Sequence, residues 1–144
     1  MRYDFGYGVD ASGVDFKLGA AKYAFENFAS PRLREEFNQF CEDNEDLVED
    51  GTAAEVFVEA FENSVYYSNG IEAFLVACIN DNECSGEDVF FNEDCCIYVP
   101  ARIPEDDKAK EKMLTQERIR EILARYLNPL VDDYVEVETV EIHD

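Results

Sequence analysis

The stretch TQERIREILARYLNPL, residues 115–130, has the strongest secondary-structure signal in the chain. Its apolar residues recur at intervals of three and four positions, which is the period of one helix face. These residues are Ile119, Ile122, Leu123, Tyr126, Leu127 and Leu130. Thr115 suits the N-cap, and Asn128-Pro129 is placed to end the helix. The stretch therefore predicts an amphipathic helix that packs one face on a core.

Strand signals lie on both sides of this helix. Val89-Phe90-Phe91 and residues 95–99 (CCIYV) are short apolar runs, and the three polar residues 92–94 between them are typical of a hairpin turn. Residues 134–143 alternate apolar and polar side chains, with a change of phase that a bulge near Thr139 would reconcile. Residues 87–144 thus predict a β-β-α-β order, and residues 81–88 a polar loop before it.

Residues 14–80 predict four helices, separated at Ser30-Pro31, at Gly51 and at residues 68–70. Ser30 is a good N-cap and Pro31 suits the first helical position. The segment 52–55 (TAAE) fits a capping box. The residues that we expect to face inward are Leu18, Ala21, Phe25, Phe28, Leu33, Phe37, Phe40, Cys41, Val48, Ala53, Val56, Phe57, Ala60, Phe61, Ser64, Ile71, Phe74, Leu75, Cys78 and Ile79.

These elements predict an α+β fold in a single domain, residues 1–144. A helical N-terminal half is followed by β-β-α-β, which forms a small antiparallel sheet with helices on one face. The acidic helical part covers residues 14–80 and the β-β-α-β part residues 87–144. Residues 1–13 alternate aromatics (Tyr3, Phe5, Tyr7) with glycines, a pattern that leaves open a short strand or an ordered arm.

The charge of the chain is concentrated in one block. The formal net charge is -22, from 34 acidic and 12 basic side chains. Residues 35–94 contain eighteen of the acids and no lysine or arginine, and residues 132–144 contain six more acids. Adaptation to high salt would spread acid over the whole surface, whereas residues 1–34 and 95–131 are nearly balanced. Segregated charge instead creates a field that attracts partners of opposite charge.

Composition argues against several classes of protein. With 47% apolar and 13% aromatic residues, the chain is not a disordered tail. Its acidity argues against direct nucleic-acid binding, because phosphate contacts need a basic surface. No apolar run approaches 20 residues and residues 1–9 hold no signal-peptide core, so we expect a cytoplasmic protein without a membrane span. Five cysteines without a secretory signal indicate reduced thiols.

No strong catalytic or metal-binding motif is present. The one histidine, His143, lies beside the C-terminus, where chains often fray. Cys95 and Cys96 are adjacent on an expected strand and point to opposite faces, so even with Cys84 they make a poor zinc site. Residues 81–87 (DNECSGE) imitate the start of an EF-hand loop, but Asn92 stands at the twelfth position, where a glutamate is needed. We expect a protein that is not an enzyme and has no metal and no cofactor.

The remaining signal is the spacing of acids on helix faces. Residues three or four apart on a helix lie about 5–6 Å apart, and phosphates along one DNA strand have a similar spacing. Such an anionic row would suit a basic cleft that evolved for nucleic acid. The carboxylates that we assign to this partner-binding surface are Glu42, Asp43, Glu45, Asp46, Glu49, Asp50, Glu55, Glu59 and Glu62.

In size, charge and charge segregation, chiefly over residues 35–94, the chain resembles the acidic DNA-mimic inhibitors of phages and mobile elements. These anti-CRISPR and anti-restriction proteins block CRISPR effectors or restriction enzymes. The resemblance implies a protein inhibitor that occupies the basic nucleic-acid-binding cleft of such an enzyme, in the cytoplasm of a bacterial host. It implies a basic nucleic-acid-binding protein as the partner, and no direct binding to nucleic acid or membrane.

Other interpretations stay open. An acidic adaptor domain would bind a basic partner without imitating DNA, and an exposed apolar patch would mark its contact surface. An enzyme would show a pocket with converging carboxylates. A basic stretch could fold onto the acids and neutralise them, or pair with the acids of a second copy in a homodimer. Its residues are Lys108, Lys110, Lys112, Arg118, Arg120 and Arg125.

Overall fold

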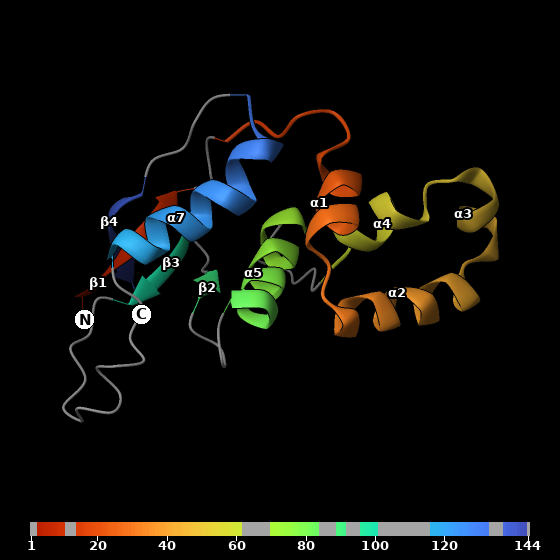
Figure 1. Cartoon of the computed structure of the whole chain (residues 1–144), viewed down its shortest axis with the longest axis horizontal. Helices are drawn as coiled ribbons and strands as arrows, with labels where there is room; N and C mark the ends of the chain where they lie inside the picture. Colours follow the sequence, from red (N-terminus) through yellow and green to blue (C-terminus); the bar gives the residue numbers. More distant parts are fainter. Residues whose placement is uncertain are drawn as a thin grey trace.

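The computed structural model describes residues 3–10, 14–61, 70–83, 89–91, 96–100, 116–132 and 137–143. The elements in chain order are β1 (Tyr3–Asp10), α1 (Ala20–Phe28), α2 (Pro31–Asp43), α3 (Glu45–Asp50), α4 (Ala53–Glu59), α5 (Gly70–Glu83), β2 (Phe90–Phe91), β3 (Cys96–Pro100), α7 (Gln116–Leu127), the 3-10 turn η1 (Asn128–Leu130) and β4 (Glu138–His143). The sheet and α7 lie at one end of the molecule, α5 in the middle and α1 to α4 at the other end (Figure 1). Within the described ranges, no helix has the length and apolar character needed to cross a bilayer.

The four strands form one antiparallel sheet in the order β2-β3-β1-β4. β1 lies inside it: residues 6–10 pair with residues 100–96 of β3, and residues 3–8 pair with residues 143–138 of β4. The register with β4 is continuous through Thr139, so the predicted bulge is wrong. The turn at residues 92–94 and the cap at Thr115 lie outside the described residues.

The predicted arrangement, a helical half followed by a self-contained β-β-α-β unit, is wrong. Helices hold most of the described residues. The sheet is not built from the second half of the chain alone, because β3 and β4 both pair with β1 and not with each other. The local pattern of residues 1–13 could not decide this, since a strand inside a sheet is stabilised by partners that are distant in sequence.

One hydrophobic core connects the sheet, α5 and α7. α7 buries the face that its periodicity predicts: Ile119, Ile122, Leu123, Tyr126 and Leu127. The helix ends at Leu127 and η1 follows with Pro129 inside it, as the sequence predicts. The amide of Lys17 donates to the carbonyl of Leu130 at 2.7 Å, which ties the segment before α1 to this end of α7.

Aromatic rings fill the space between α1, α2, α4 and α5. Phe57 of α4 lies in their middle, with its ring centroid 5.4 Å from those of Phe37 and Phe40. The rings of Phe25 and Phe74 are each 6.2 Å from that of Phe57, in edge-to-face contact. Such pairs add to the energy of area burial. The cluster therefore fixes the position of α2 and α4 against the rest of the core.

Three predicted inward residues face solvent instead: Leu18, Val48 and Ala60. A fourth, Ser64, lies outside the described residues. Leu18 is fully exposed because α1 begins only at Ala20, after Gly19 adopts a left-handed φ of 82°. Val48 is 49% exposed because Asn44 separates α2 from α3. The Asn44 side chain donates to the carbonyl of Phe40 at 2.9 Å, a local bond that competes with a continuous helix.

The helix caps follow local chemistry at two of three predicted positions. The hydroxyl of Ser30 accepts from the amide of Leu33 at 3.2 Å, and Pro31 is the first residue of α2. Gly51, at φ 76°, ends α3. The predicted capping box at Thr52 is wrong, because its side chain makes no capping hydrogen bond. Its amide instead donates to the carbonyl of Leu47 at 3.1 Å and completes the end of α3.

α5 is longer than the sequence predicts. It continues through Asp81, Asn82 and Glu83, where we expected a polar loop. At its start, a Cβ on Gly70 would overlap the carbonyl groups of Val58 and Glu59, so α5 begins in close contact with α4. The helical conformation holds the three polar residues in fixed directions at the end of α5.

Candidate protein-binding surface

The predicted partner-binding carboxylates lie on three successive helices, α2, α3 and α4, which we call the acidic lobe. Glu42 and Asp43 end α2, and Glu55 and Glu59 lie on α4. The four between them are on α3: Glu45, Asp46, Glu49 and Asp50. All are exposed except Glu55, which is partly buried. Glu62 lies outside the described residues.

Five of these carboxylates stand where a helix disfavours negative charge: Glu59 is the last residue of α4, and the other four end α2 and α3. Glu42 and Asp43 lie in the last turn of α2, Glu49 and Asp50 lie in the last turn of α3, and neither turn contains a basic residue. A helix C-terminus carries partial negative charge, so each acid there costs about 0.3–1 kcal/mol. The charge placement therefore lowers stability, and a cationic partner would offset that cost.

Within the described residues, none of the eight carboxylates forms an ion pair. Ion pairs form instead at Glu26, Glu36, Asp81, Glu83 and Glu121, among other acids. Arg34, which follows the start of α2, donates to carbonyls at the end of α1 and lies over the ring of Phe25 at 5.3 Å. The acidic lobe thus keeps its negative field in the part of the chain that the structure describes.

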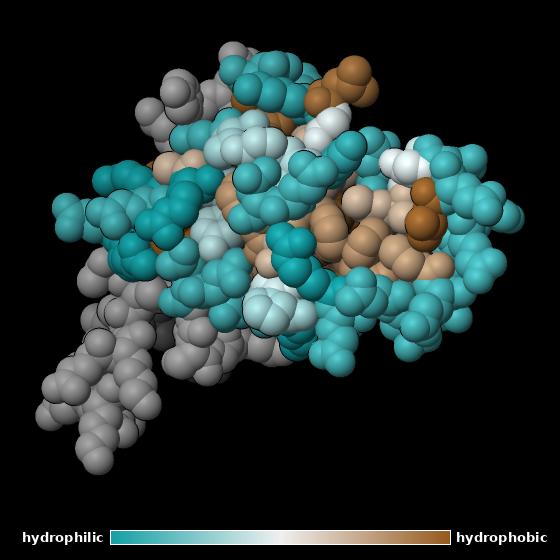
Figure 2. Space-filling view, turned by 45° about the vertical axis from the view of Figure 1, so that its right-hand side comes forward, coloured by the Kyte–Doolittle hydropathy of each residue, from teal (hydrophilic) through white to brown (hydrophobic). Residues whose placement is uncertain are grey.

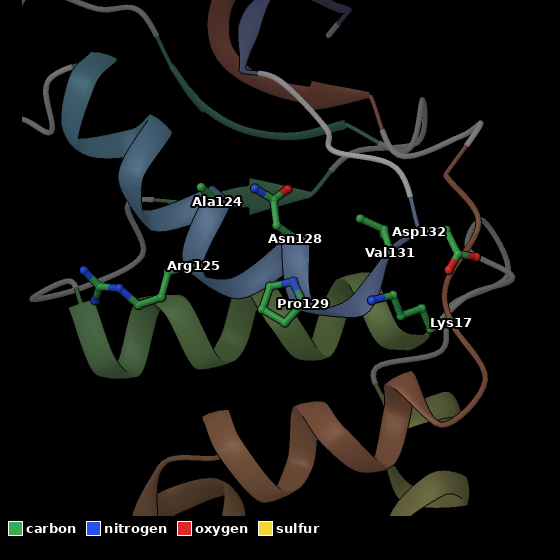
Figure 3. A pocket seen from close by; sticks show the side chains of 7 residues that line it. All are labelled: Lys17, Ala124, Arg125, Asn128, Pro129, Val131 and Asp132. Carbon is green, nitrogen blue, oxygen red and sulfur yellow. The ribbon is translucent and has the colours of Figure 1, made fainter.

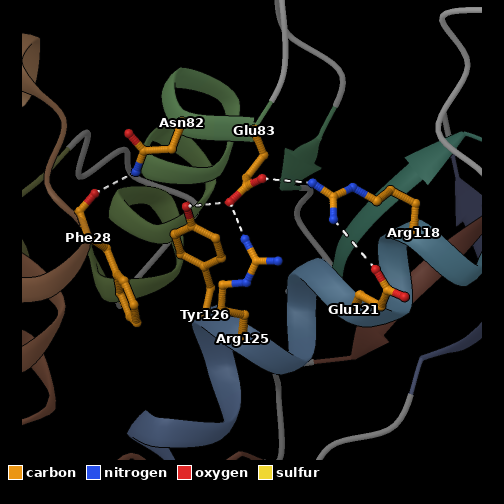
Figure 4. Close-up of polar contacts among 7 residues, drawn as sticks. All are labelled: Phe28, Asn82, Glu83, Arg118, Glu121, Arg125 and Tyr126. Carbon is orange, nitrogen blue, oxygen red and sulfur yellow. Dashed lines mark hydrogen bonds and ion pairs between the residues drawn. The ribbon is translucent and has the colours of Figure 1, made fainter.

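Two of the three described arginines of the basic stretch contact α5, and the third, Arg120, is exposed. Arg118 and Arg125 hold the two oxygens of Glu83 at 2.9 and 2.6 Å (Figure 4). Arg118 also lies 3.5 Å from Glu121 on its own helix. Lys108, Lys110 and Lys112 lie outside the described residues. Between described residues, neither Arg118 nor Arg125 forms an ion pair with one of the eight carboxylates of the lobe.

Asp81, Asn82 and Glu83 form what we call the α5 clasp. Asp81 accepts from the hydroxyl of Ser30 at 2.6 Å and from Arg32 at 3.0 Å. Asn82 donates to the carbonyl of Phe28 at 2.7 Å, and Glu83 accepts from the hydroxyl of Tyr126 at 3.2 Å (Figure 4). The clasp therefore joins the α1–α2 junction to α7, and these acids serve the fold.

Two groups near the clasp have raised pKa values. Burial, reinforced by the charge of Asp81, raises the pKa of the Cys78 thiol to about 12, and the side chain is fully buried. Cys78 therefore behaves as the small apolar residue that its position in α5 predicts. Burial is also the main cause that raises the pKa of Tyr126, with the charge of Glu83 adding to it. Both groups are neutral at physiological pH.

The acidic lobe also exposes apolar side chains, and the sequence assigned all of them except Leu47 to the core. On α2 and α3, Phe37, Phe40, Cys41 and Leu47 are partly exposed and Val48 is exposed; we call these five residues the apolar patch. Figure 2 shows hydrophobic surface on this part of the molecule, surrounded by hydrophilic side chains. The sequence signal for this patch is the apolar stripe on α2 and α3. The stripe is longer than the part of the core on which it packs, so some of its residues keep exposed surface.

A separate pocket of about 380 Å³ lies beside the end of α7 (Figure 3). Its polar side chains are Lys17, Arg125, Asn128 and Asp132. The pocket holds one carboxylate, whereas acid–base catalysis by paired carboxylates needs at least two that converge. In the described ranges, no three His, Cys, Asp or Glu side chains are grouped to hold a metal ion. The pocket therefore gives no support to a catalytic site.

Comparison of the chain with protein families, with curated proteins and with solved structures found no match. The functional argument therefore rests on the acidic lobe and its surroundings.

Proposed function

We propose that the protein is an acidic inhibitor that binds the basic nucleic-acid-binding cleft of a defence nuclease, of the CRISPR or restriction type, in place of nucleic acid. The observation that carries the proposal is the set of eight carboxylates on α2 to α4, seven of them exposed and none in an ion pair with a described residue. A cleft that binds nucleic acid is lined with Lys and Arg and accepts such a surface.

The placement of these acids supports a binding role. Solvation alone would be served by acids at helix N-termini, where the dipole favours them. Here Glu42, Asp43, Glu49 and Asp50 stand at C-terminal ends without a basic neighbour in the same turn. Glu45, Asp46 and Glu55 stand in first turns, so only part of the charge of the lobe is carried at a cost in stability. That part fits a surface completed by the cations of another protein.

The experiment is a competition for DNA. A restriction endonuclease and a CRISPR effector complex would each be incubated with labelled duplex DNA and increasing amounts of the protein, and DNA binding would be followed by fluorescence anisotropy. We expect displacement of DNA from at least one of them, and no binding of the protein to DNA itself. The displacement should weaken as NaCl rises, because exposed charges are screened within about 8–10 Å at physiological ionic strength.

Two variants with equal charge make this test specific. The first neutralises Glu45, Asp46, Glu49 and Asp50; the control neutralises Asp15, Glu117, Asp132 and Glu138, which are exposed elsewhere. We expect the first to weaken inhibition about tenfold or more, at roughly 0.2–1 kcal/mol for each exposed pair. The control should retain most of the inhibition. Equal losses in both would show that net charge, and not this surface, causes the effect.

The apolar patch favours a second candidate, an acidic adaptor that binds a basic partner without imitating nucleic acid. One measurement distinguishes the mimic from the adaptor. Nucleic acid competes with the mimic for its partner, whereas an adaptor leaves the partner's nucleic-acid site open and forms a ternary complex.

A further inference from the structure

We propose that the partner surface presents an apolar side chain set among lysines and arginines, and that this side chain packs on the apolar patch of the acidic lobe. The inference rests on the proposed function in one respect, because it takes the lobe to be the binding surface. It adds the chemistry that the partner must have there, which charge alone does not specify.

The apolar patch packs on buried aromatic rings on one side and faces solvent on the other. The rings of Phe37 and Phe40 lie 6.5 Å apart in a stacked pair, and both contact the buried Phe57 at 5.4 Å. Val48 is 49% exposed. An apolar side chain placed here would contact packed rings that are already in position, so it would lose water without a rearrangement of the lobe.

Carboxylates surround the patch along the chain and on the surface. Leu47 and Val48 sit on α3 between Asp46 and Glu49, and Cys41 on α2 directly precedes Glu42. Figure 2 shows hydrophobic surface on this part of the molecule inside a hydrophilic rim. A partner surface that complements this lobe is therefore apolar in its centre and cationic at its edge.

Duplex DNA offers its binding proteins a purely anionic backbone, and a strict imitation of it would have no apolar centre. Protein surfaces that bind single-stranded nucleic acid combine cations with exposed aromatic side chains, on which bases stack. A basic amphipathic helix presents a similar combination. The apolar patch thus points to a partner of this mixed character and away from one that reads the duplex backbone alone.

The test uses two synthetic peptides of equal length and equal lysine content. One is an amphipathic helix with leucine along one face, and the other has alanine in place of each leucine. Binding of each labelled peptide to the full chain would be measured by fluorescence anisotropy at about 0.15 M and about 0.5 M NaCl. We expect the leucine peptide to bind about tenfold more tightly, and the difference to persist at high salt, where charge is screened.

Two single substitutions locate the effect. Val48→Ser removes apolar surface from the patch, and Leu18→Ser removes an exposed leucine that lies outside it. We expect Val48→Ser to weaken binding of the leucine peptide about fivefold and the alanine peptide little, and Leu18→Ser to change neither. Equal effects of the two substitutions, or equal binding of the two peptides, would overturn the inference and leave the competition for DNA as a separate result.

Two further outcomes would also test the inference. If neither peptide binds, the lobe is not a site for basic partners, and the inference fails together with the proposed function. Sedimentation velocity of the protein alone would reveal a dimer. If Val48→Ser dissociates it, the occupant of the patch is a second copy of this chain and the inference is wrong.

Discussion

Nη1 of Arg125 lies 2.6 Å from Oε1 of Glu83, and this ion pair joins α7 to the end of α5 across 42 positions of sequence. Nη2 of Arg118 holds the other carboxylate oxygen at 2.9 Å. Glu83 stands at the C-terminal end of its helix, where the dipole disfavours its charge. The two arginines offset that cost, in contrast to the acids that end α2 and α3.

Glu83→Gln should therefore destabilise the fold by about 1–3 kcal/mol. The Glu83 side chain is only 13% exposed, and the substitution removes the negative charge with which both guanidinium groups pair. Urea unfolding followed by circular dichroism measures the change. Glu121→Gln is the matched control, since Glu121 is 67% exposed and 3.5 Å from Arg118. It should cost less than about 0.5 kcal/mol; equal costs would show that the clasp does not stabilise the fold.

Ser30→Ala should cost about 1 kcal/mol, within a range of roughly 0.5–2, because α2 loses its N-cap and Asp81 loses a donor at 2.6 Å. Thr52→Ala is the comparison, because Thr52 precedes α4 without a side-chain capping bond. It should change the free energy of unfolding by less than about 0.5 kcal/mol. A larger loss at Thr52 than at Ser30 would contradict the capping described here.

Gly70→Ala should destabilise the protein by about 1–3 kcal/mol, because the new Cβ meets the carbonyls of Val58 and Glu59 and forces α5 away from α4. At Gly51 a Cβ has open space, but φ is 76°. Gly51→Ala should therefore cost only the left-handed strain, about 1 kcal/mol, and Gly51→Asn less. Thermal unfolding of the three variants would separate the two causes.

The raised pKa of Cys78 predicts a loss of stability at high pH. The folded pKa, about 12, lies above the ordinary value of 9.0, so the stabilising effect of the neutral thiol is complete below about pH 9. It falls as pH rises toward 12, by up to about 1.4 kcal/mol per pH unit. Urea unfolding between pH 8 and pH 11 should show a shallower decline for Cys78→Ala than for wild type.

Charge neutralisation at opposite ends of α3 should have opposite effects on stability. Glu49→Gln with Asp50→Asn removes acids from the last turn and should stabilise the fold by about 0.3–1 kcal/mol. Glu45→Gln with Asp46→Asn removes the same charge from the first turn and gives up a favourable dipole interaction. A difference between the two double variants that persists in high salt would argue against this electrostatic account.

Features that depend on local chemistry could be predicted from the sequence. The buried face of α7, the cap at Ser30 and the end of α3 at Gly51 all follow from residues within one or two helical turns. The exposure of the acids on α2 and α3 follows in the same way, because they alternate with the apolar stripe.

Features that depend on distant partners could not be predicted. The place of β1 is set by strands near residues 100 and 140, and the length of α5 by the arginines and hydroxyls that its last turn meets. The exposure of Val48 depends on how Asn44 divides α2 from α3. For the candidate surface, periodicity placed the carboxylates on exposed helix faces. It also turned Phe37 and Phe40 toward the core, against which they pack, but it did not reveal that they keep exposed surface or that Val48 faces solvent.

The central place of β1 also has a consequence for biosynthesis. β1 is made before every other described element, yet its pairing partners Gly6–Pro100 and Gly8–Glu138 are about 94 and 130 positions apart. At translation rates of roughly 5–20 residues per second, the second partner follows after roughly 7–26 s. Both edges of the nascent strand are open to pairing with other chains until β3 is made, and the edge that pairs with β4 stays open for the whole interval. The sheet is therefore completed late, and a chaperone that shields β1 would raise the yield of folded protein.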